Sequence, residues 1–312
     1  MKQIFYSGVF IALFAASARA ADLADAFLEN GLGPRGVGMG GAHLAVVDDA
    51  SAAYWNPAGL VYGRGKDLLA AIQPLSLDRR QNSVSARLNL RGELGLGFTW
   101  LHAGVDNIVG RTSDGRPTGV VEDAANAFYF AIGRALGEEL SIGLVLKTLN
   151  HQIKAPGTGT SKGTGHGFDL GVQYRPNAKI ALAAVWRNLN ADLNWKVQRS
   201  SDQSSTTEDP LPPAVALGAA YRPLANLQLA LDLSSSEVDR YANLGAEWRL
   251  NPLLTARAGL HRIGGEDSGS GLVAAGLTLR PMRRRAVQFH YTYAADALDA
   301  GGRTSVGLTV AL

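Results

Sequence analysis

The stretch FDLGVQYR (residues 168–175) alternates bulky apolar residues with small or polar ones. Successive side chains of a β-strand point to opposite faces, so the stretch predicts a strand with one apolar face and one polar or crowded face. The same two-residue period recurs at 227–234, 244–250 and 287–293. Strands of this kind suit a barrel with apolar surroundings outside and a polar interior.

From about residue 66 onward the alternation divides into fourteen segments, most of them eight to eleven residues long. A tilted strand needs about 9–11 residues to cross a bilayer. The expected strands are roughly 66–76, 83–90, 93–103, 126–136, 140–153, 165–175, 180–190, 214–223, 227–236, 243–250, 254–262, 271–280, 286–294 and 305–312.

The connections between these segments alternate in length. Tight turns are expected at 91–92, 137–139, 176–179, 223–226, 251–253 and 281–285. Longer polar loops are expected at 77–82, 104–125, 154–164, 191–213, 237–242, 263–270 and 295–304. Short turns on one side and longer loops on the other are typical of bacterial outer-membrane barrels, whose short side is periplasmic. The sequence therefore predicts an all-β fold, a fourteen-stranded antiparallel transmembrane barrel in the outer membrane of a Gram-negative cell.

Composition and the first twenty residues agree with this fold. Charged residues make up 18% of the 312-residue chain, against about 25% in soluble domains. Lys2, the apolar run 4–16 and the small residues around Arg19 predict a signal peptide cleaved after Ala20. Without Lys2 and Arg19, 28 basic residues face 27 acidic ones, so the net charge falls from +3 to about +1. The expected division is 1–20 signal peptide, 21–65 N-terminal hatch and 66–312 barrel.

Enzymatic and nucleic-acid functions find no support in the sequence. There is no Cys, and the six His residues are scattered without paired metal-ligand spacing. Residues 159–163 match G-x-S-x-G but lie in a polar hairpin without strand–elbow–helix context. No basic stripe interleaved with aromatic residues is present. We therefore expect no catalytic residue, no metal, no cofactor and no nucleic-acid partner. The charges predicted to face the lumen are expected to form interior ion pairs: Arg87, Lys147, Asp169, Arg187, Asp232, Glu247, Arg249 and Arg257.

Residues 36–60 (GVGMGGAHLAVVDDASAAYWNPAGL) are rich in glycine and lack the two-residue alternation of the expected strands. Their glycines allow crowded or left-handed backbone. Asp48, Asp49 and Ser51 are N-cap types before a short helix that would run through Tyr54. Asn56 precedes a proline, which disfavours helical backbone there, and 57–59 then suits a turn.

This segment resembles the N-terminal signature of the FadL-type long-chain fatty-acid transporters and the related PorV/PorQ proteins. The matching elements are Gly-Met-Gly-Gly-Ala, then Asp-Asp-Ala, then Asn-Pro-Ala-Gly-Leu, at similar spacing. The resemblance implies a fourteen-stranded barrel with a hatch inside its lumen. It also ties the Asn-Pro-Ala element to transport. The candidate hatch and transport residues are Gly38, Met39, Gly40, Gly41, Asp48, Asp49, Asn56, Pro57, Ala58 and Gly59.

Two functions are compatible with the resemblance. The first is passive transport of fatty-acid-like hydrophobic small molecules, and the second is a PorV/PorQ-like role with a secreted protein as partner. The regions expected to form the longest loops are polar and contain a single large aromatic residue, Trp195, which favours the compact PorV/PorQ-like branch. Transport is nevertheless the better-founded activity of the superfamily. Outer-membrane lipid and lipopolysaccharide are expected surroundings in either case.

Two glycines of the third expected strand, Gly95 and Gly97, lie on its lumen side. A glycine inside a strand often marks a bulge or a close backbone approach. In the transporter family a kink in this strand makes a lateral opening, so the resemblance implies that Gly95 and Gly97 serve such an opening. The alternative is that they only clear space for the hatch.

Overall fold

A computed structural model describes residues 26–63, 65–91, 93–156, 159–199, 203–265, 271–281, 286–295 and 302–312. The predicted signal peptide, residues 1–20, lies outside the described residues, as do residues 21–25 and 64 of the predicted hatch. Within the described ranges, no helix has the length and apolar character to span a membrane.

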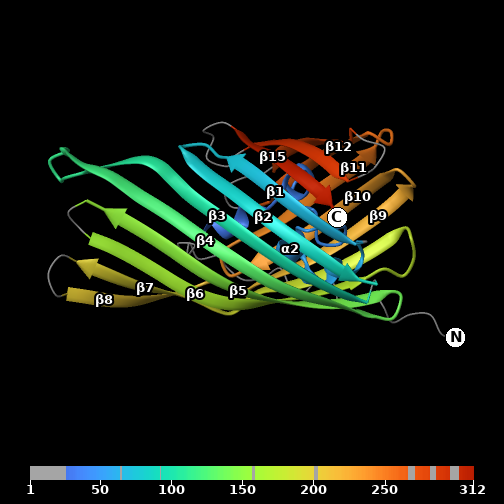
Figure 1. Ribbon diagram of the computed structural model, residues 1–312, viewed down its shortest axis with the longest axis horizontal. Coiled ribbons are helices and arrows are strands. Elements are labelled where there is room, and N and C mark those ends of the chain that lie inside the picture. The colour runs from blue at the N-terminus through green and yellow to red at the C-terminus, as the bar shows by residue number, and fades with distance from the viewer. Residues whose placement is uncertain are drawn as a thin grey trace.

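Fourteen antiparallel strands close into a barrel (Figure 1). Neighbours in sequence pair with one another, β7 pairs with β9, and β15 returns to pair with β1. The strands are β1 Lys66–Pro74, β2 Arg79–Leu90, β3 Leu94–Arg111, β4 Pro117–Leu136, β5 Leu140–Ala155, β6 Gly159–Tyr174, β7 Ile180–Arg199, β8 Gln203–Pro210, β9 Ala214–Leu224, β10 Leu227–Ser236, β11 Arg240–Arg249, β12 Leu254–Ile263, β13 Leu272–Leu279, β14 Val287–Ala295 and β15 Gly302–Ala311. The fifteenth strand, β8, pairs only with the outer part of β7 and is not part of the closed ring. The expected fourteen-stranded fold is confirmed.

The prediction of long polar loops is largely wrong. The region 104–125 is mainly strand, because β3 runs to Arg111 and β4 begins at Pro117. Likewise β5 and β6 take up most of 154–164, and β7 with β8 takes up most of 191–213. These strands extend the barrel wall at one end, seen as the long green and yellow ribbons of Figure 1. We call this the long-loop end, and the opposite one the short-turn end.

β-Bulges explain why the alternation was lost in 104–125 and in 191–213. The β3–β4 register shifts between Val105 and Ile108, where Asn107 has φ of 59°. In β7, Asn188 and Asn190 have φ of 59° and 47° beside a register shift against β6. An extra residue in a bulge moves every following side chain to the other face. The two-residue period therefore changes phase and looks like an irregular loop.

The outward face of the barrel is apolar. Alternate residues of many strands are exposed, and they include Ile72, Phe130, Leu144, Tyr221 and Tyr291. The intervening residues point inward and are buried, as in the alternating pattern of β1 and β13. A contiguous exposed apolar surface of this size is unusual for a soluble monomer.

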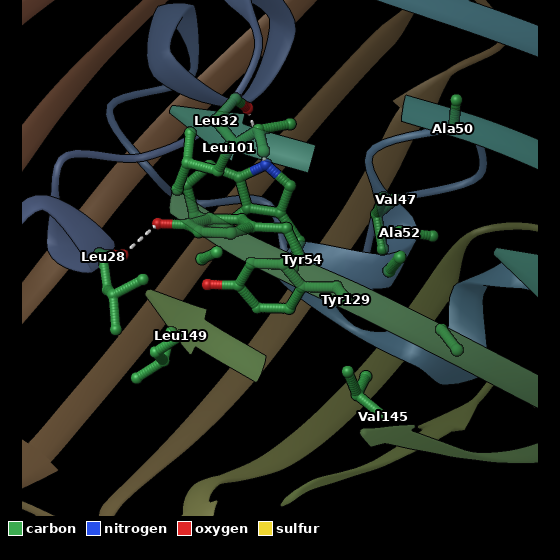
Figure 2. Close-up of a cluster of buried hydrophobic side chains, with 14 of the residues drawn as sticks. Leu28, Leu32, Val47, Ala50, Ala52, Tyr54, Leu101, Tyr129, Val145 and Leu149 are labelled. Carbon is green, nitrogen blue, oxygen red and sulfur yellow. Dashed lines mark hydrogen bonds between the residues drawn. The ribbon is translucent and has the colours of Figure 1, made fainter. Parts of the chain in front are cut away.

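Residues 26–63, named the lumenal segment here, fill the barrel interior. They contain four short helices: η1 Ala26–Glu29, α1 Pro34–Gly38, α2 Ala52–Trp55 and η2 Pro57–Val61. The largest buried cluster joins this segment to inward side chains of the wall (Figure 2). There the Tyr54 hydroxyl donates to the Leu28 carbonyl at 2.6 Å, and its ring meets Tyr129 edge-on with centroids 5.8 Å apart.

Candidate functional site

A salt-bridge cluster on Arg35 joins the lumenal segment to the wall. Arg35, in α1, lies 3.0 Å through Nε from Oε2 of Glu247 in β11, and Glu247 also pairs with Arg257 of β12 at 2.6 Å. The Arg35 Nη1 atom lies 2.5 Å from Asp48 and 3.0 Å from Asp49. The Arg35 side chain is only 19% exposed, so water screens these pairs less than it would at the surface. One guanidinium therefore ties two parts of the segment to β11, and Glu247 extends the cluster to Arg257 of β12.

The two predicted capping aspartates have this different role. Helix α2 begins after Ser51, whose side chain makes no capping hydrogen bond. Asp49 instead accepts from the backbone and hydroxyl of Ser51 at 2.9 and 2.5 Å, and both aspartates pair with Arg35. Ser51 is thus the N-cap residue, and capping by Asp48 is wrong, because its carboxylate pairs with the Arg35 guanidinium instead. Asp49 does both: one of its oxygens accepts the Ser51 amide before the helix, and the other pairs with Arg35.

The Gly-Met-Gly-Gly element packs against β11, β12, β13 and β14. Gly40 and Gly41 have φ of 63° and 82°, a backbone that favours glycine. A Cβ on Gly245 would lie 2.5 Å from the Met39 carbonyl oxygen, and one on Gly38 would meet the Thr292 hydroxyl at 3.1 Å. Glycines on both surfaces therefore permit backbone-to-backbone contact.

Residues 43–47 are held by polar side chains of the wall. One carboxylate oxygen of Asp232, in β10, accepts from the backbone amides of His43 and Leu44 at 2.7 and 2.9 Å. Gln173, in β6, donates to the Ala45 carbonyl at 2.6 Å. These bonds satisfy the buried backbone of a loop that has no secondary structure of its own.

Asn56 organises the Asn-Pro-Ala turn. Its backbone is extended, with φ of −158°, as the following proline predicts. Its side-chain oxygen accepts from the Ala58 amide at 3.1 Å, and its side-chain nitrogen donates to the carbonyls of Leu44 and Val172 at 3.1 and 3.3 Å. One side chain therefore caps η2, holds the 43–47 loop and binds β6. The expected turn at 57–59 is the first part of η2.

A row of glycines in the wall receives this turn. Gly95, Gly133, Gly143 and Gly171 are successive cross-strand partners in β3, β4, β5 and β6. A Cβ on Gly143 would lie 2.5 Å from the Ala58 amide nitrogen, and one on Gly133 would lie 2.6 Å from the Pro57 carbonyl oxygen. Ala58 is fully buried there, and its carbonyl accepts from Ser141 at 3.0 Å. Inside the segment, Gly59 packs on the Val47 carbonyl, 2.6 Å from the position of a Cβ.

Gly95 and Gly97 face Leu60. A Cβ on Gly95 would lie 2.5 Å from the Leu60 Cβ, and one on Gly97 would lie 2.8 Å from Leu60 Cδ2. Strand β3 pairs with β2 and β4 through both glycines without a register shift. The wall is therefore continuous at this point, with the lumenal segment directly behind it.

The interior ion pairs expected from the sequence are largely confirmed. Lys147 pairs with Asp169 at 2.7 Å, and Arg87 donates through Nε to Asp67 at 2.6 Å. Three of the expected charges have other surroundings: Arg187 donates to the Trp55 carbonyl, Asp232 accepts backbone amides, and Arg249 is exposed at the short-turn end. Within the described residues, no group of three or more His, Asp or Glu side chains is placed to hold a metal ion.

His43 is a buried titratable group between these anchors. Its side chain is fully buried, and both ring nitrogens are without a hydrogen-bond partner. Burial, and then the charge of Arg35, lower the pKa of His43 to about 4. Burial would raise the pKa of Asp49, but Arg35 outweighs this effect and holds it below the usual value. At neutral pH the segment therefore carries a neutral imidazole together with the charged Asp49 carboxylate.

A cavity of about 280 Å³ lies beside η1. Apolar groups such as Phe27, Leu75 and Ala125 form part of its lining. Polar groups form another part, and among them His151 pairs with Asp123 at 2.7 Å. The cavity suits a small amphipathic molecule at the edge of the lumenal segment.

Sequence reasoning missed Arg35 and the glycines of β4 to β6. Arg35 lies just before the motif, but its partner Glu247 is 212 residues away. Gly133, Gly143 and Gly171 all occupy inward positions of predicted strands, which is the available signal. That the three glycines lie side by side on adjacent strands depends on strand register, and the sequence pattern does not determine the register.

The closed fourteen-stranded antiparallel barrel is a fold that known structures share. Three of them cover most of this chain: the CymD monoaromatic hydrocarbon channel (TM-score 0.64, 13% identity, 90% of this chain and 98% of that one), the toluene transporter TodX of Pseudomonas putida (0.62, 11%, 89% and 97%) and a FadL homologue of Pseudomonas aeruginosa (0.63, 10%, 89% and 98%). No family model and no curated protein matches the sequence. The likeness establishes the fold, and these comparisons do not support the PorV/PorQ link.

Proposed function

We propose that this protein is an outer-membrane barrel that carries hydrophobic small molecules across the membrane without energy input. The apolar outward face supports insertion in a bilayer. The fold likeness to hydrocarbon and toluene transporters supports the class of cargo. Fold alone does not fix function, so the proposal rests chiefly on how the lumen is filled.

The observation that carries the proposal is the attachment of the lumenal segment. The wall holds it through the Arg35 salt-bridge cluster, a few hydrogen bonds and close packing on glycine, with no disulfide because the chain has no cysteine. Contacts of this kind release when a ligand supplies competing interactions. We infer that the lumenal segment is the hatch and that 66–312 is the barrel domain.

Cargo would enter at the long-loop end and stop in the cavity beside η1. From there it would displace the hatch. The turn of Asn56, Pro57 and Ala58 would move, and the Gly38–Gly41 element would be the second point at which the hatch detaches from the wall. Exit would follow either inward or sideways through the wall. The contacts of Gly95 and Gly97 with Leu60 support a space-clearing role for these glycines. A lateral opening there would require a break in an unbroken ladder.

Intact Gram-negative cells test the proposal, because lipopolysaccharide excludes apolar solutes. Cells that express the protein are compared with cells that express an unrelated barrel of similar size. We expect faster accumulation of labelled toluene or long-chain fatty acid and unchanged accumulation of labelled glucose. Equal rates for the apolar probes, or recovery of the protein in the soluble periplasm, would contradict the proposal.

A further inference from the structure

Two lysines lie side by side on the outward face of the extended barrel wall. Lys162 of β6 and Lys196 of β7 are cross-strand partners, and both are exposed. Their direction follows from their neighbours along the strands, because Gly163 is buried and Trp195 packs against the buried cluster of the lumen. Successive side chains of a strand point to opposite faces, so both lysines point away from the lumen. We call them the lysine pair.

The lysine pair lies just beyond the apolar band of the outward face. Along β6 the outward side chains are apolar from Tyr174 to Phe168, with 37 to 44% exposure, and polar from His166 onward. From Tyr174 to Lys162 the strand runs about 40 Å at about 3.3 Å per residue. A tilt of about 35–45° turns this length into roughly 30 Å across the membrane, against about 25 Å for the apolar band. If the barrel spans a membrane as proposed above, the two ammonium groups lie at headgroup level on the outer side.

Neutral hydrogen-bonding groups surround the lysine pair. Gln152 of β5 is the second cross-strand partner of Lys162, and Thr206 of β8 is that of Lys196. The next outward row towards the membrane consists of Asn150, Thr164 and Asn194. Amide and hydroxyl groups both donate and accept hydrogen bonds, which suits the hydroxyl groups of a sugar.

The acidic residues near the lysine pair do not neutralise it. In the described part of the chain, neither ammonium group forms an ion pair or a hydrogen bond. Glu208 of β8 is a diagonal neighbour of Lys196, roughly 7–8 Å away, and Asp192 lies about 13 Å along β7. Glu122 is paired with Lys154 at 2.7 Å. Because like charges directly opposite on neighbouring strands repel, an anion between the two lysines would relieve the repulsion.

We propose that the lysine pair binds a phosphate group of lipopolysaccharide, on the lipid A moiety that anchors this glycolipid in the outer leaflet. The inference rests on the proposed outer-membrane function. Two ammonium groups on adjacent strands act as point charges that can contact one phosphate together. The row of amide and hydroxyl groups would meet the sugar that carries the phosphate, and the apolar side chains of Phe168 and Leu170 would meet the acyl chains.

The test compares two double variants that lose the same charge. Lys162→Gln/Lys196→Gln changes the lysine pair, and Lys66→Gln/Lys179→Gln changes two exposed cations of the short-turn end. Lys162→Arg/Lys196→Arg keeps the charge of the pair. Heat-modifiable gel migration first establishes that each variant is folded, and Lys162→Gln alone serves if the double variant is not.

Lipid A, its dephosphorylated form and phosphatidylglycerol are then titrated separately onto the purified barrel, with native mass spectrometry as the readout. EDTA is present, so that no divalent cation joins a phosphate to Glu208. We expect Lys162→Gln/Lys196→Gln to weaken lipid A binding about 25-fold, from roughly fivefold per lysine. The arginine variant and the short-turn variant should bind lipid A as the wild type does, and dephosphorylated lipid A should not distinguish the variants.

Unchanged lipid A binding in Lys162→Gln/Lys196→Gln, or an equal loss in the short-turn variant, would overturn the proposal. An equal loss of phosphatidylglycerol binding would overturn it in favour of a general attraction to anionic lipids. Toluene uptake by cells is measured separately, so failed uptake with intact lipid A binding contradicts transport and not the lysine pair.

Discussion

Asn56 of the lumenal segment and Gly171 of the wall are in direct contact, and the contact leaves no room for a side chain at position 171. A Cβ on Gly171 would overlap the Asn56 side-chain oxygen and lie 2.8 Å from Pro57 Cδ. The Asn56 nitrogen meanwhile donates to the next wall carbonyl, that of Val172, at 3.3 Å. The Asn-Pro-Ala turn therefore packs against the wall partly through hydrogen bonds and partly because Gly171 has no side chain in its way.

The substitution Gly171→Ala should weaken the packing of the Asn-Pro-Ala turn against β6. Overpacking of a well-packed contact costs about 1–3 kcal/mol, and here the cost falls on the docking of the segment. We expect faster amide hydrogen exchange over 43–60 and little change in the strands. Leu170→Ala is the matched control, since Leu170 is 44% exposed on the outward face of the same strand. Unchanged exchange over 43–60 in Gly171→Ala would show that this packing tolerates a methyl group.

Removal of the Arg35 charge should weaken docking of the lumenal segment more than Gly171→Ala does. Arg35→Gln leaves Asp48, Asp49 and Glu247 without their shared partner. Loss of one member of a buried pair costs about 3 kcal/mol. Arg35→Lys should cost less, because it keeps the charge and loses only the forked geometry. Limited proteolysis of the segment measures both variants.

The exposed pair of Arg116 with Asp114 supplies the control for Arg35. The Arg116 side chain is 83% exposed, so Arg116→Gln should leave proteolysis unchanged. Equal protection of the segment in wild type and Arg35→Gln would show that the cluster does not hold it.

Low pH should weaken docking of the lumenal segment, because it protonates His43. Its pKa is about 4 in the folded protein, against about 6.5 in an unfolded chain. The folded state thus disfavours the proton, so the stabilisation is complete above pH 6.5 and is lost as the pH falls from 6.5 to 4. The loss approaches about 3 kcal/mol at the lower limit.

Hydrogen exchange over 43–60 between pH 7 and 4, corrected for intrinsic exchange rates, measures this loss. The variant His43→Leu should remove the part of this loss that His43 contributes. Asp49 contributes only in stronger acid, because its pKa is held below the usual value. Identical profiles for the wild type and His43→Leu from pH 7 to 4 would exclude His43 as a titrating group.

Gly97 and Leu60 allow the two roles considered for the β3 glycines to be separated. Gly97→Val places methyl groups against Leu60 Cδ2, which already lies 2.8 Å from the position of a Cβ. We expect lower uptake and a displaced segment, and recovery of both in Gly97→Val/Leu60→Ala, where volume is restored. Recovery of segment order without recovery of uptake would favour a lateral opening at this strand.

The fold was predictable because a two-residue period over eight residues determines both strand and face. The strands β1, β10 and β12 lie within two residues of their expected ends. The outer ends of β3 and β7 were not predictable, since bulges at Asn107 and Asn188 shift the phase.

The candidate site was predictable only in part. The motif located Asn56 and the glycines of the segment, because proline and glycine restrict backbone locally. Its partners depend on register and closure, as with Arg35 and Glu247 or with Asn56 and Gly171. Residues so far apart in sequence meet only after the ring has formed.

A reversible cross-link tests most directly whether the hatch must move. The chain has no cysteine, so Ala53→Cys/Gly97→Cys introduces one pair. A Cβ on Gly97 would lie 3.2 Å from the Ala53 Cβ, slightly closer than the 3.5–4.5 Å typical of disulfides. Ser85→Cys/Thr99→Cys is the control, because these residues are cross-strand partners within the wall.

Toluene uptake by intact cells is measured with each pair oxidised and then reduced, with disulfide formation verified by mass spectrometry. We expect the oxidised Ala53–Gly97 pair to reduce uptake to the level of cells without the protein, and dithiothreitol to restore it. The wall pair should be indifferent to oxidation. Full uptake through a barrel whose Ala53–Gly97 cross-link is complete would contradict a moving hatch.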